Sequence, residues 1–115
     1  MKIKLSDPPF CQIRIHWRKL QQLDQQLKNN FDISLDEAIL LCCISHSCKN
    51  QGDIAGQTGL TPTQASRVLS RLETKGFIDR SVGEDDKRKM LFTINTAGEK
   101  KLQEISPAGF EYLAL

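Results

Sequence analysis

The chain has 115 residues, the length of one small domain, and a formal net charge of only +2, so it is not a polycation. No apolar run approaches the roughly 20 residues that a transmembrane helix needs, and the N-terminal stretch MKIKLSDPPF lacks the apolar centre of a signal peptide. We therefore expect a cytoplasmic protein without a membrane partner, whose four cysteines are free thiols rather than disulfides.

A long amphipathic helix is predicted over residues 10–31, directly after the helix-start sequence Asp7-Pro8-Pro9. Its apolar residues recur in steps of three and four, at Ile13, Trp17, Leu20, Leu23, Leu27 and Phe31. A helix of about 20 residues spans about 30 Å, which is long for a chain of this size. Two interpretations remain open: the helix contacts a second subunit and forms a dimer, or it is an ordinary core helix with Trp17 inside.

A second helix is predicted to begin after Ser34, a good N-cap residue, and Glu37 three residues later completes a capping box. Its apolar residues are Leu35, Ala38, Ile39, Leu41, Cys42 and Ile44. Because this segment is apolar on most sides, we expect it to be the central, buried helix and to end between His46 and Asn50.

The stretch DIAGQTGLTPTQASRVLSR, residues 53–71, is predicted to form two short helices joined by a tight turn. Gly59 can adopt the left-handed conformation that ends the first of these helices. Thr61 is a natural N-cap of the next helix, Pro62 occupies its first position, and Gln64 completes a capping box. This order of signals is typical of a helix-turn-helix. Asp53 and Thr61 are interpreted as helix caps rather than as DNA-contacting residues.

The helix that begins at Pro62 has one apolar and one polar face. The apolar face is Ala65, Val68, Leu69 and Leu72, and the outward face is Thr63, Ser66, Arg67, Ser70 and Arg71. Short hydroxyl side chains permit close approach to DNA, and arginine binds guanine edges or phosphate, so the outward face is typical of a helix that enters the major groove. The competing interpretation is a helical hairpin whose charged face is merely solvated.

A β-hairpin and a further helix are predicted after Gly76, which ends the preceding helix. Residues 77–82 and 90–94 have strand character and flank the charged loop GEDDKRK, as in the wing of a winged helix. Asn95 or Thr96 then caps a short helix that is expected to stop at Ser106-Pro107, before the apolar tail FEYLAL. The predicted fold is mainly α with a small β-hairpin, a winged helix-turn-helix. Residues 1–115 are expected to be one domain, with 34–94 as its core and 96–115 as a short helix and tail.

Three blocks of the sequence resemble the MarR family of bacterial winged-helix transcriptional regulators: LETKGFIDR at 72–80, DKR at 86–88 and TINTAG at 93–98. They occur in the family's order and spacing, and the resemblance covers about residues 33–102, with a looser likeness in the first helix. It implies a homodimer that binds a pseudo-palindromic double-stranded DNA operator, usually as a repressor. It also implies that the fourth helix enters the major groove and the wing a neighbouring minor groove.

The family's DNA-binding positions are carried over residue by residue. Those expected to face bases and nearby phosphates are Thr63, Gln64, Ser66, Arg67 and Ser70. Arg71 is expected to bind phosphate or to brace the wing. In the wing, Arg88 matches the arginine that enters the minor groove and Asp86 the residue that holds it, while Lys87 and Lys89 add charge.

The chain departs from the family pattern in two ways. Residues 61–89 contain seven Lys or Arg and five Asp or Glu, an excess of only +2, so weak non-specific affinity with a shallow salt dependence is expected. Only residues 96–115 follow the wing, where the family usually has a longer helix and a final one. The first helix and the FEYLAL tail are therefore expected to form a reduced or rearranged dimer interface.

A cluster of potential ligands lies in the second helix and just after it, at Cys42, Cys43, His46 and Cys48. Cys43 and His46 have the i, i+3 spacing of two ligands on one helix face, which supports a thiol- or metal-responsive site. The alternative is that Cys42 and Cys43 are small core residues, and the absence of a C-x-x-C pair favours it. No resident metal or cofactor is expected.

Members of the family often bind small aromatic or lipophilic anions between their dimerisation and DNA-binding parts. The resemblance implies a small-molecule effector as a partner, with Arg14, Trp17 and Phe31 as candidate lining residues. The sequence itself identifies no ligand.

The sequence favours a DNA-binding regulator over two other classes of function. A winged-helix module for protein contacts, with weak or no DNA binding, is the alternative, because the basic patch is small and the C-terminus short. An enzyme is not expected, because the sequence has no glycine-rich phosphate loop, no G-x-S-x-G and no H-E-x-x-H.

Overall fold

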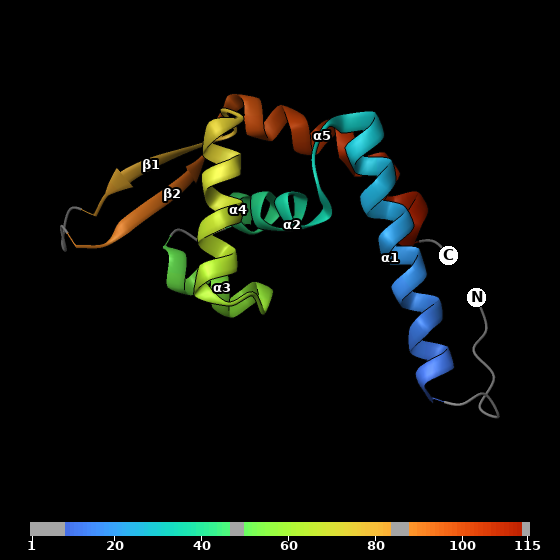
Figure 1. Cartoon of the computed structure of the whole chain (residues 1–115). Helices are drawn as coiled ribbons and strands as arrows, with labels where there is room; N and C mark the ends of the chain where they lie inside the picture. Colours follow the sequence, from blue (N-terminus) through green and yellow to red (C-terminus); the bar gives the residue numbers. More distant parts are fainter. Residues whose placement is uncertain (1–8, 47–49, 84–87, 114–115) are drawn as a thin grey trace.

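The computed structural model describes residues 9–46, 50–83 and 88–113, with side chains as far as residue 106. The elements in chain order are α1 (Pro9–Phe31), α2 (Leu35–His46), α3 (Gln51–Thr58), α4 (Pro62–Thr74), β1 (Ile78–Val82), β2 (Met90–Ile94) and α5 (Thr96–Leu113). This order confirms the mainly helical chain with one hairpin (Figure 1). The molecule is elongated, with principal extents of 55 × 27 × 20 Å.

The core forms around α2, as the sequence predicts. Leu40 and Leu41 of α2 are fully buried and belong to one cluster with residues from α3, α4, both strands and α5. The largest side chains at its centre are Phe92, Leu27, Ile33, Leu40, Leu41, Ile54, Leu69, Leu72 and Ile78. One side of α2 is left uncovered, since Ile39 and Cys42 are exposed.

Short-range hydrogen bonds fix the helix ends, at the predicted positions for the starts of α2 and α4 but not for the start of α3. The Ser34 backbone N–H donates to Glu37 (2.9 Å), and the Glu37 backbone N–H donates to the Ser34 hydroxyl (3.3 Å), which completes the capping box of α2. Gly59 has a φ of 77°, and Thr61 and Gln64 form the second capping box at the start of α4. The N-cap of α3 is Asn50 rather than Asp53, because the Asn50 side chain accepts from the Asp53 backbone N–H.

The two strands form an antiparallel hairpin with a register from Ile78↔Ile94 to Val82↔Met90. The hairpin projects from the helices on the side opposite α1 (Figure 1). β1 begins at Ile78 and not at the predicted Phe77. The Phe77 backbone instead closes the turn after α4, where its N–H donates to Leu72 (3.0 Å), and its carbonyl accepts from Asn95 (3.1 Å). Asn95 also caps α5, because its side chain accepts from the Gly98 N–H (2.9 Å).

Helix α5 continues through Pro107 as far as Leu113, so the predicted stop at Ser106-Pro107 is wrong. Proline removes one backbone donor, but its fixed φ is compatible with a helix, so the chain can continue past it at a cost of about 3 kcal/mol. α5 crosses from the hairpin to α1 and contacts both α1 and α2 (Figure 1).

Helix α1 is buried only towards its C-terminal end. Leu23 and Leu27 belong to the core, whereas Ile13 is 57% and Trp17 62% exposed. The interpretation of Trp17 as a core residue is therefore wrong. In Figure 1 the N-terminal half of α1 stands apart from α2, α3 and α4. No helix in the described part of the chain is long and apolar enough to span a membrane.

Candidate nucleic-acid interface

Helix α4 presents the two faces that the sequence assigns to it. Its buried residues are Ala65, Val68, Leu69 and Leu72. The residues assigned to DNA on this helix are all exposed: Thr63, Gln64, Ser66, Arg67, Ser70 and Arg71. The apolar face anchors the helix on α2 and α3, so the outward face has a defined orientation.

The start of α4 is held by local contacts with the turn and with α3. The Gln51 amide donates to the Pro62 carbonyl (3.1 Å), which joins the first turn of α3 to that of α4. The Thr61 backbone N–H donates to the Gln64 side-chain oxygen (2.9 Å). This capping contact engages the oxygen of Gln64, so a contact with a base would use its amide nitrogen as a donor.

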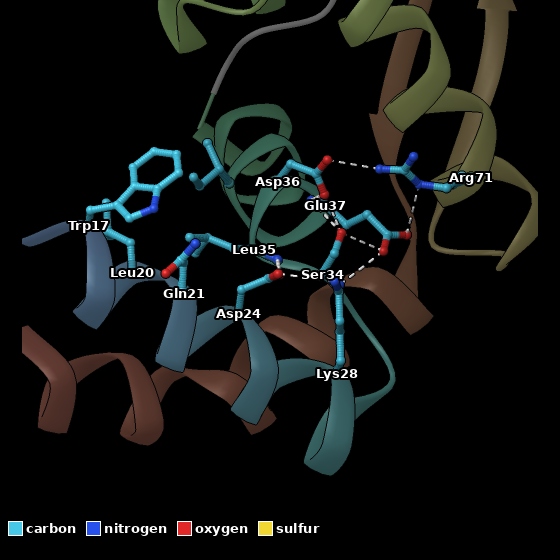
Figure 2. A pocket seen from close by; sticks show the side chains of 11 residues that line it. Trp17, Leu20, Gln21, Asp24, Lys28, Ser34, Leu35, Asp36, Glu37 and Arg71 are labelled. Carbon is cyan, nitrogen blue, oxygen red and sulfur yellow. Dashed lines mark hydrogen bonds and ion pairs between the residues drawn. The ribbon is translucent and has the colours of Figure 1, made fainter. Parts of the chain in front are cut away.

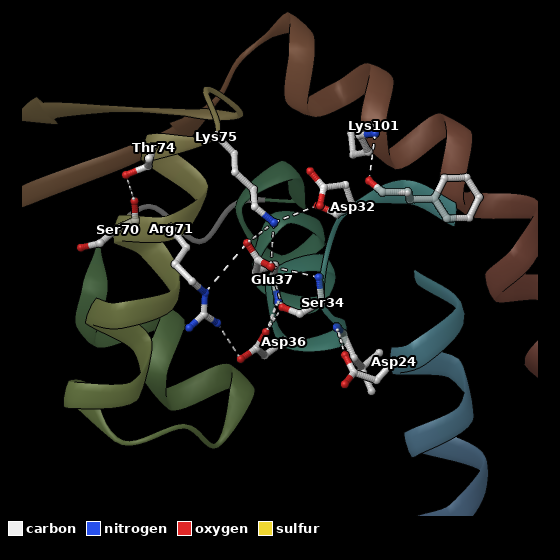
Figure 3. A network of polar contacts seen from close by, with 12 residues as sticks. Asp24, Asp32, Ser34, Asp36, Glu37, Ser70, Arg71, Thr74, Lys75 and Lys101 are labelled. Atoms are coloured by element: carbon white, nitrogen blue, oxygen red, sulfur yellow. Dashed lines mark hydrogen bonds and ion pairs between the residues drawn. The ribbon is translucent and has the colours of Figure 1, made fainter. Parts of the chain in front are cut away.

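Three basic residues, one each from α4, the following turn and β1, form ion pairs with carboxylates of the same chain. Arg71 Nη2 lies 2.9 Å from Asp36, Lys75 Nζ lies 3.0 Å from Glu37, and Arg80 Nη2 lies 2.9 Å from Glu73. The two pairs that involve α2 are drawn in Figure 3. These contacts reduce the positive charge that the described part of the surface can offer to phosphate.

The wing is braced by Arg80 and not by Arg71. The Arg80 guanidinium pairs with Glu73 of α4 and lies 5.3 Å from the centre of the Phe92 ring of β2. It therefore joins the recognition-type helix to both strands of the hairpin. Arg88 and Lys89 are exposed beyond these strands, whereas Asp86 and Lys87 lie outside the described residues, so the predicted Asp86–Arg88 contact remains a prediction.

Glu37 is the buried charged residue of the described core, with 3% of its surface exposed. Its carboxylate accepts from the Ser34 hydroxyl (2.7 Å) and from Lys75 Nζ (3.1 Å), besides the Ser34 N–H. Burial by itself raises the pKa of Glu37, but the hydrogen bonds from Ser34 and the charge of Lys75 outweigh burial and lower that pKa. The group is thus held as an anion at neutral pH.

A cavity of about 670 Å³ lies between α1, α2 and Arg71 of α4 (Figure 2). Its apolar wall is Trp17, Leu20, Leu35 and Ile39, and its polar lining is Gln21, Asp24, Lys28, Ser34, Asp36, Glu37 and Arg71. Among the predicted lining residues, Trp17 lines this cavity, whereas Arg14 and Phe31 do not. Phe31 packs against the core instead.

The two described cysteines of the cluster differ in burial. Cys42 is exposed, and Cys43 is partly buried with its thiol 3.5 Å from the Gln57 side-chain oxygen. The expectation of a buried core residue is therefore wrong for Cys42, which lies on the uncovered side of α2, whereas Cys43 packs against the core from its edge. His46 is exposed and Cys48 lies outside the described residues. Among the described residues, no group of three or more His, Cys, Asp or Glu side chains is placed to hold a metal ion.

The partners Asp36, Glu73 and Arg80 were not assigned to any site from the sequence, and Glu37 was assigned only as a cap. Arg71 and Asp36 are 35 positions apart, and no local pattern indicates that they meet. Glu73 and Arg80 flank the turn between α4 and β1. Their opposite charges on either side of Gly76 were the sequence signal that could have indicated this ion pair.

The helix-turn-helix, its bare outward face and the braced hairpin together have a clear counterpart among known proteins. The model of the MarR family matches residues 35–90. This part of the chain is a MarR-family winged helix. The match spans α2 to the first residue of β2, and therefore includes every residue that the sequence assigns to DNA.

Solved MarR-type structures match nearly the whole chain. The MepR–DNA complex from Staphylococcus aureus is 25% identical, with a TM-score of 0.82, over 98% of this chain and 82% of that one. The regulator BldR from Sulfolobus solfataricus (17% identical, TM-score 0.83, 90% and 74% covered) and a variant of MarR from E. coli (21%, 0.81, 95% and 82%) share the fold. Among curated proteins, none has a significantly similar sequence.

Proposed function

We propose that the protein is a sequence-specific double-stranded DNA-binding transcriptional regulator that acts as a repressor. The observation that carries this proposal is the outward face of α4, where hydroxyl and guanidinium side chains are exposed on a helix anchored by its opposite face. The MepR–DNA complex supports it, because that protein has the same fold over nearly the whole of this chain and is crystallised with DNA.

In this proposal α4 lies in the major groove and the wing lies over a neighbouring minor groove. Thr63, Gln64, Ser66, Arg67 and Ser70 contact base edges and adjacent phosphates. Arg88 enters the minor groove, where the negative potential attracts a guanidinium, and Lys87 and Lys89 add backbone charge. A contact between Asp86 and Arg88 remains a prediction.

We further propose a cytoplasmic homodimer, formed through α1, that binds a pseudo-palindromic operator. The exposed apolar residues of α1 support it, since a row of Phe10, Ile13, Trp17 and Leu20 is uncovered in one copy of the chain. The cavity beside Trp17 is the proposed place for a small-molecule effector. We assign no enzymatic activity to the chain.

The test is selection of a duplex from a random-sequence library by the wild-type protein, followed by affinity measurements on the selected duplex. We expect Arg67→Ala to weaken binding at least about fivefold, since a bidentate arginine–guanine contact is worth about 1–3 kcal/mol. The control is Lys100→Ala, which removes an exposed cation of α5 that is not among the residues proposed to contact DNA. Equal, weak binding to every duplex would contradict the proposal.

That contrary result would favour the second candidate, a winged-helix module for protein contacts. The observation in its favour is the engagement of Arg71, Lys75 and Arg80 by carboxylates, which leaves little net positive charge around α4. For a third candidate, a regulator of the same fold that responds to thiol oxidation, the supporting observation is the exposure of Cys42.

A further inference from the structure

The first turn of α2, residues 34–37, receives polar contacts from two other helices. From α1, the Asp24 carboxylate accepts a hydrogen bond from the Leu35 backbone N–H (2.8 Å). From α4, Arg71 Nη2 donates to Asp36 Oδ2 (2.9 Å). Figure 3 shows the two contacts on either side of the same turn. The first turn of α2 therefore contacts both α1 and α4 and links the two helices.

The basic residues near the end of α4 are directed towards this turn. The Nε atom of Arg71 lies 4.0 Å from Glu37, in addition to the Asp36 contact of its Nη2. Lys75, one helical turn later, donates to the Asp32 carbonyl (2.8 Å) and pairs with Glu37. Arg67, one turn earlier, is exposed on the outward face.

We infer that Arg71 is a positioning residue, which holds α4 in register with α1 through its ion pair with Asp36, rather than a phosphate-binding residue. The inference rests on the proposed DNA-binding function. If α1 joins two copies, the distance between their α4 helices depends on this connection within each copy. The DNA fixes the spacing of the two major grooves that the two α4 helices enter. If α4 is held less firmly relative to α1, the two helices match that spacing less often, and the affinity falls although no DNA contact is removed.

The two roles of Arg71 predict different responses to Asp36→Asn. A phosphate-binding arginine is released by this change and binds DNA at least as well. A positioning arginine loses its partner, and DNA affinity falls. They also differ in salt dependence, because each phosphate contact that is lost reduces the slope of log K against log salt by about 0.9.

The experiment compares wild type, Asp36→Asn, Arg71→Ala and the double variant on the duplex that wild type selects from a random library. We expect each single change to weaken binding about two- to fivefold, as for the loss of an exposed ion pair, with an unchanged salt slope. The double variant is expected to bind no more weakly than either single variant, because both changes remove one interaction. Asp36→Glu, which keeps the carboxylate, is expected to retain most of the affinity.

Lys89→Ala is the control, because it removes an exposed cation of the wing that is proposed to contact phosphate, and it is expected to reduce the salt slope. Thermal melting of each variant separates a loss of folding from a loss of positioning. Undiminished binding by Asp36→Asn, additive losses in the double variant or a reduced slope for Arg71→Ala would overturn this inference alone. If wild type selects no duplex, the proposed function fails, and this inference fails with it.

Discussion

Gly98 occupies a place in the first turn of α5 where no side chain fits. A Cβ atom built at this position would overlap the backbone carbonyl oxygen of Phe77 and would lie 2.7 Å from Cγ1 of Ile94. The glycine therefore allows α5 to begin directly against the end of the hairpin. Gly98 is the last residue of the block TINTAG, and this close packing explains why a glycine is needed at that position of the block.

We expect Gly98→Ala to lower the free energy of unfolding by about 1–3 kcal/mol, because the obstructing atom is backbone and cannot rotate away. The matched control is Gly56→Ala in α3, where nothing lies within 4 Å of the added methyl group. There alanine is expected to stabilise the helix by up to about 1 kcal/mol. Denaturant unfolding of both variants measures the difference, and equal effects of the two changes would contradict the packing argument.

Glu37 links the stability of the protein to acid pH. Its pKa is lower in the folded chain than its ordinary value of 4.5, so the folded state favours the carboxylate. The stabilisation is fully present above that ordinary value. It is lost as the pH falls towards the lowered pKa, because the unfolded chain binds the proton first.

We expect Glu37→Gln to lower the free energy of unfolding by about 1–2 kcal/mol at pH 7, since a charged hydrogen-bonded group is replaced in a buried site. The difference between variant and wild type should shrink when both are unfolded at pH 3. Asp24 also has a lowered pKa, chiefly through the Leu35 N–H, but it is present in both proteins and cancels in the comparison. A difference that stays constant with pH would contradict the assigned role of the Glu37 carboxylate.

At the scale of the element, the sequence predicts what short-range contacts determine. The capping boxes of α2 and α4, the left-handed Gly59 and the buried face of α4 all depend on residues within about one helical turn, and all were correctly predicted. The ion pair between Arg71 and Asp36 depends on how α2 and α4 cross, which periodicity does not report. The same limit applies to α1, where one apolar repeat continues from buried Leu27 to exposed Ile13.

The wing offers a test of contacts between elements. We expect Arg80→Ala to increase amide hydrogen exchange in β1 and β2, because it removes the pair with Glu73 and the contact with the Phe92 ring, which together contribute about 1 kcal/mol. Exchange in the buried helix α2 should change much less. Arg67→Ala, which removes an exposed arginine of α4, is the control. Unchanged exchange in the hairpin of Arg80→Ala would show that the strands alone hold the wing.

At the scale of the whole molecule, α1 accounts for much of the elongated shape. Its C-terminal end is fixed by Leu23 and Leu27 in the core, and by Lys101 of α5, which donates to the Phe31 carbonyl (3.2 Å). Its other end carries Phe10, 83% exposed, and Ile13 on the same apolar row. A helix that is packed on the core at one end and exposes apolar side chains along the rest can bind a second copy through the exposed part. Periodicity alone does not show which apolar residues are covered within one chain, so it left both interpretations of α1 open.

We expect wild-type protein to sediment as a dimer and Ile13→Glu to sediment as a monomer. A carboxylate on the apolar row would be buried in the subunit interface without an opposite charge, which is unfavourable. Ile13 does not line the core of its own chain, so the helical circular dichroism should persist. Gln22→Glu places the same charge on the opposite face of α1 and should leave the dimer intact. The monomer should also bind the selected duplex more weakly, because the two half-sites are no longer held by one molecule. If Ile13→Glu remains dimeric, the subunit contact lies elsewhere, and the spacing between recognition helices cannot be set through α1.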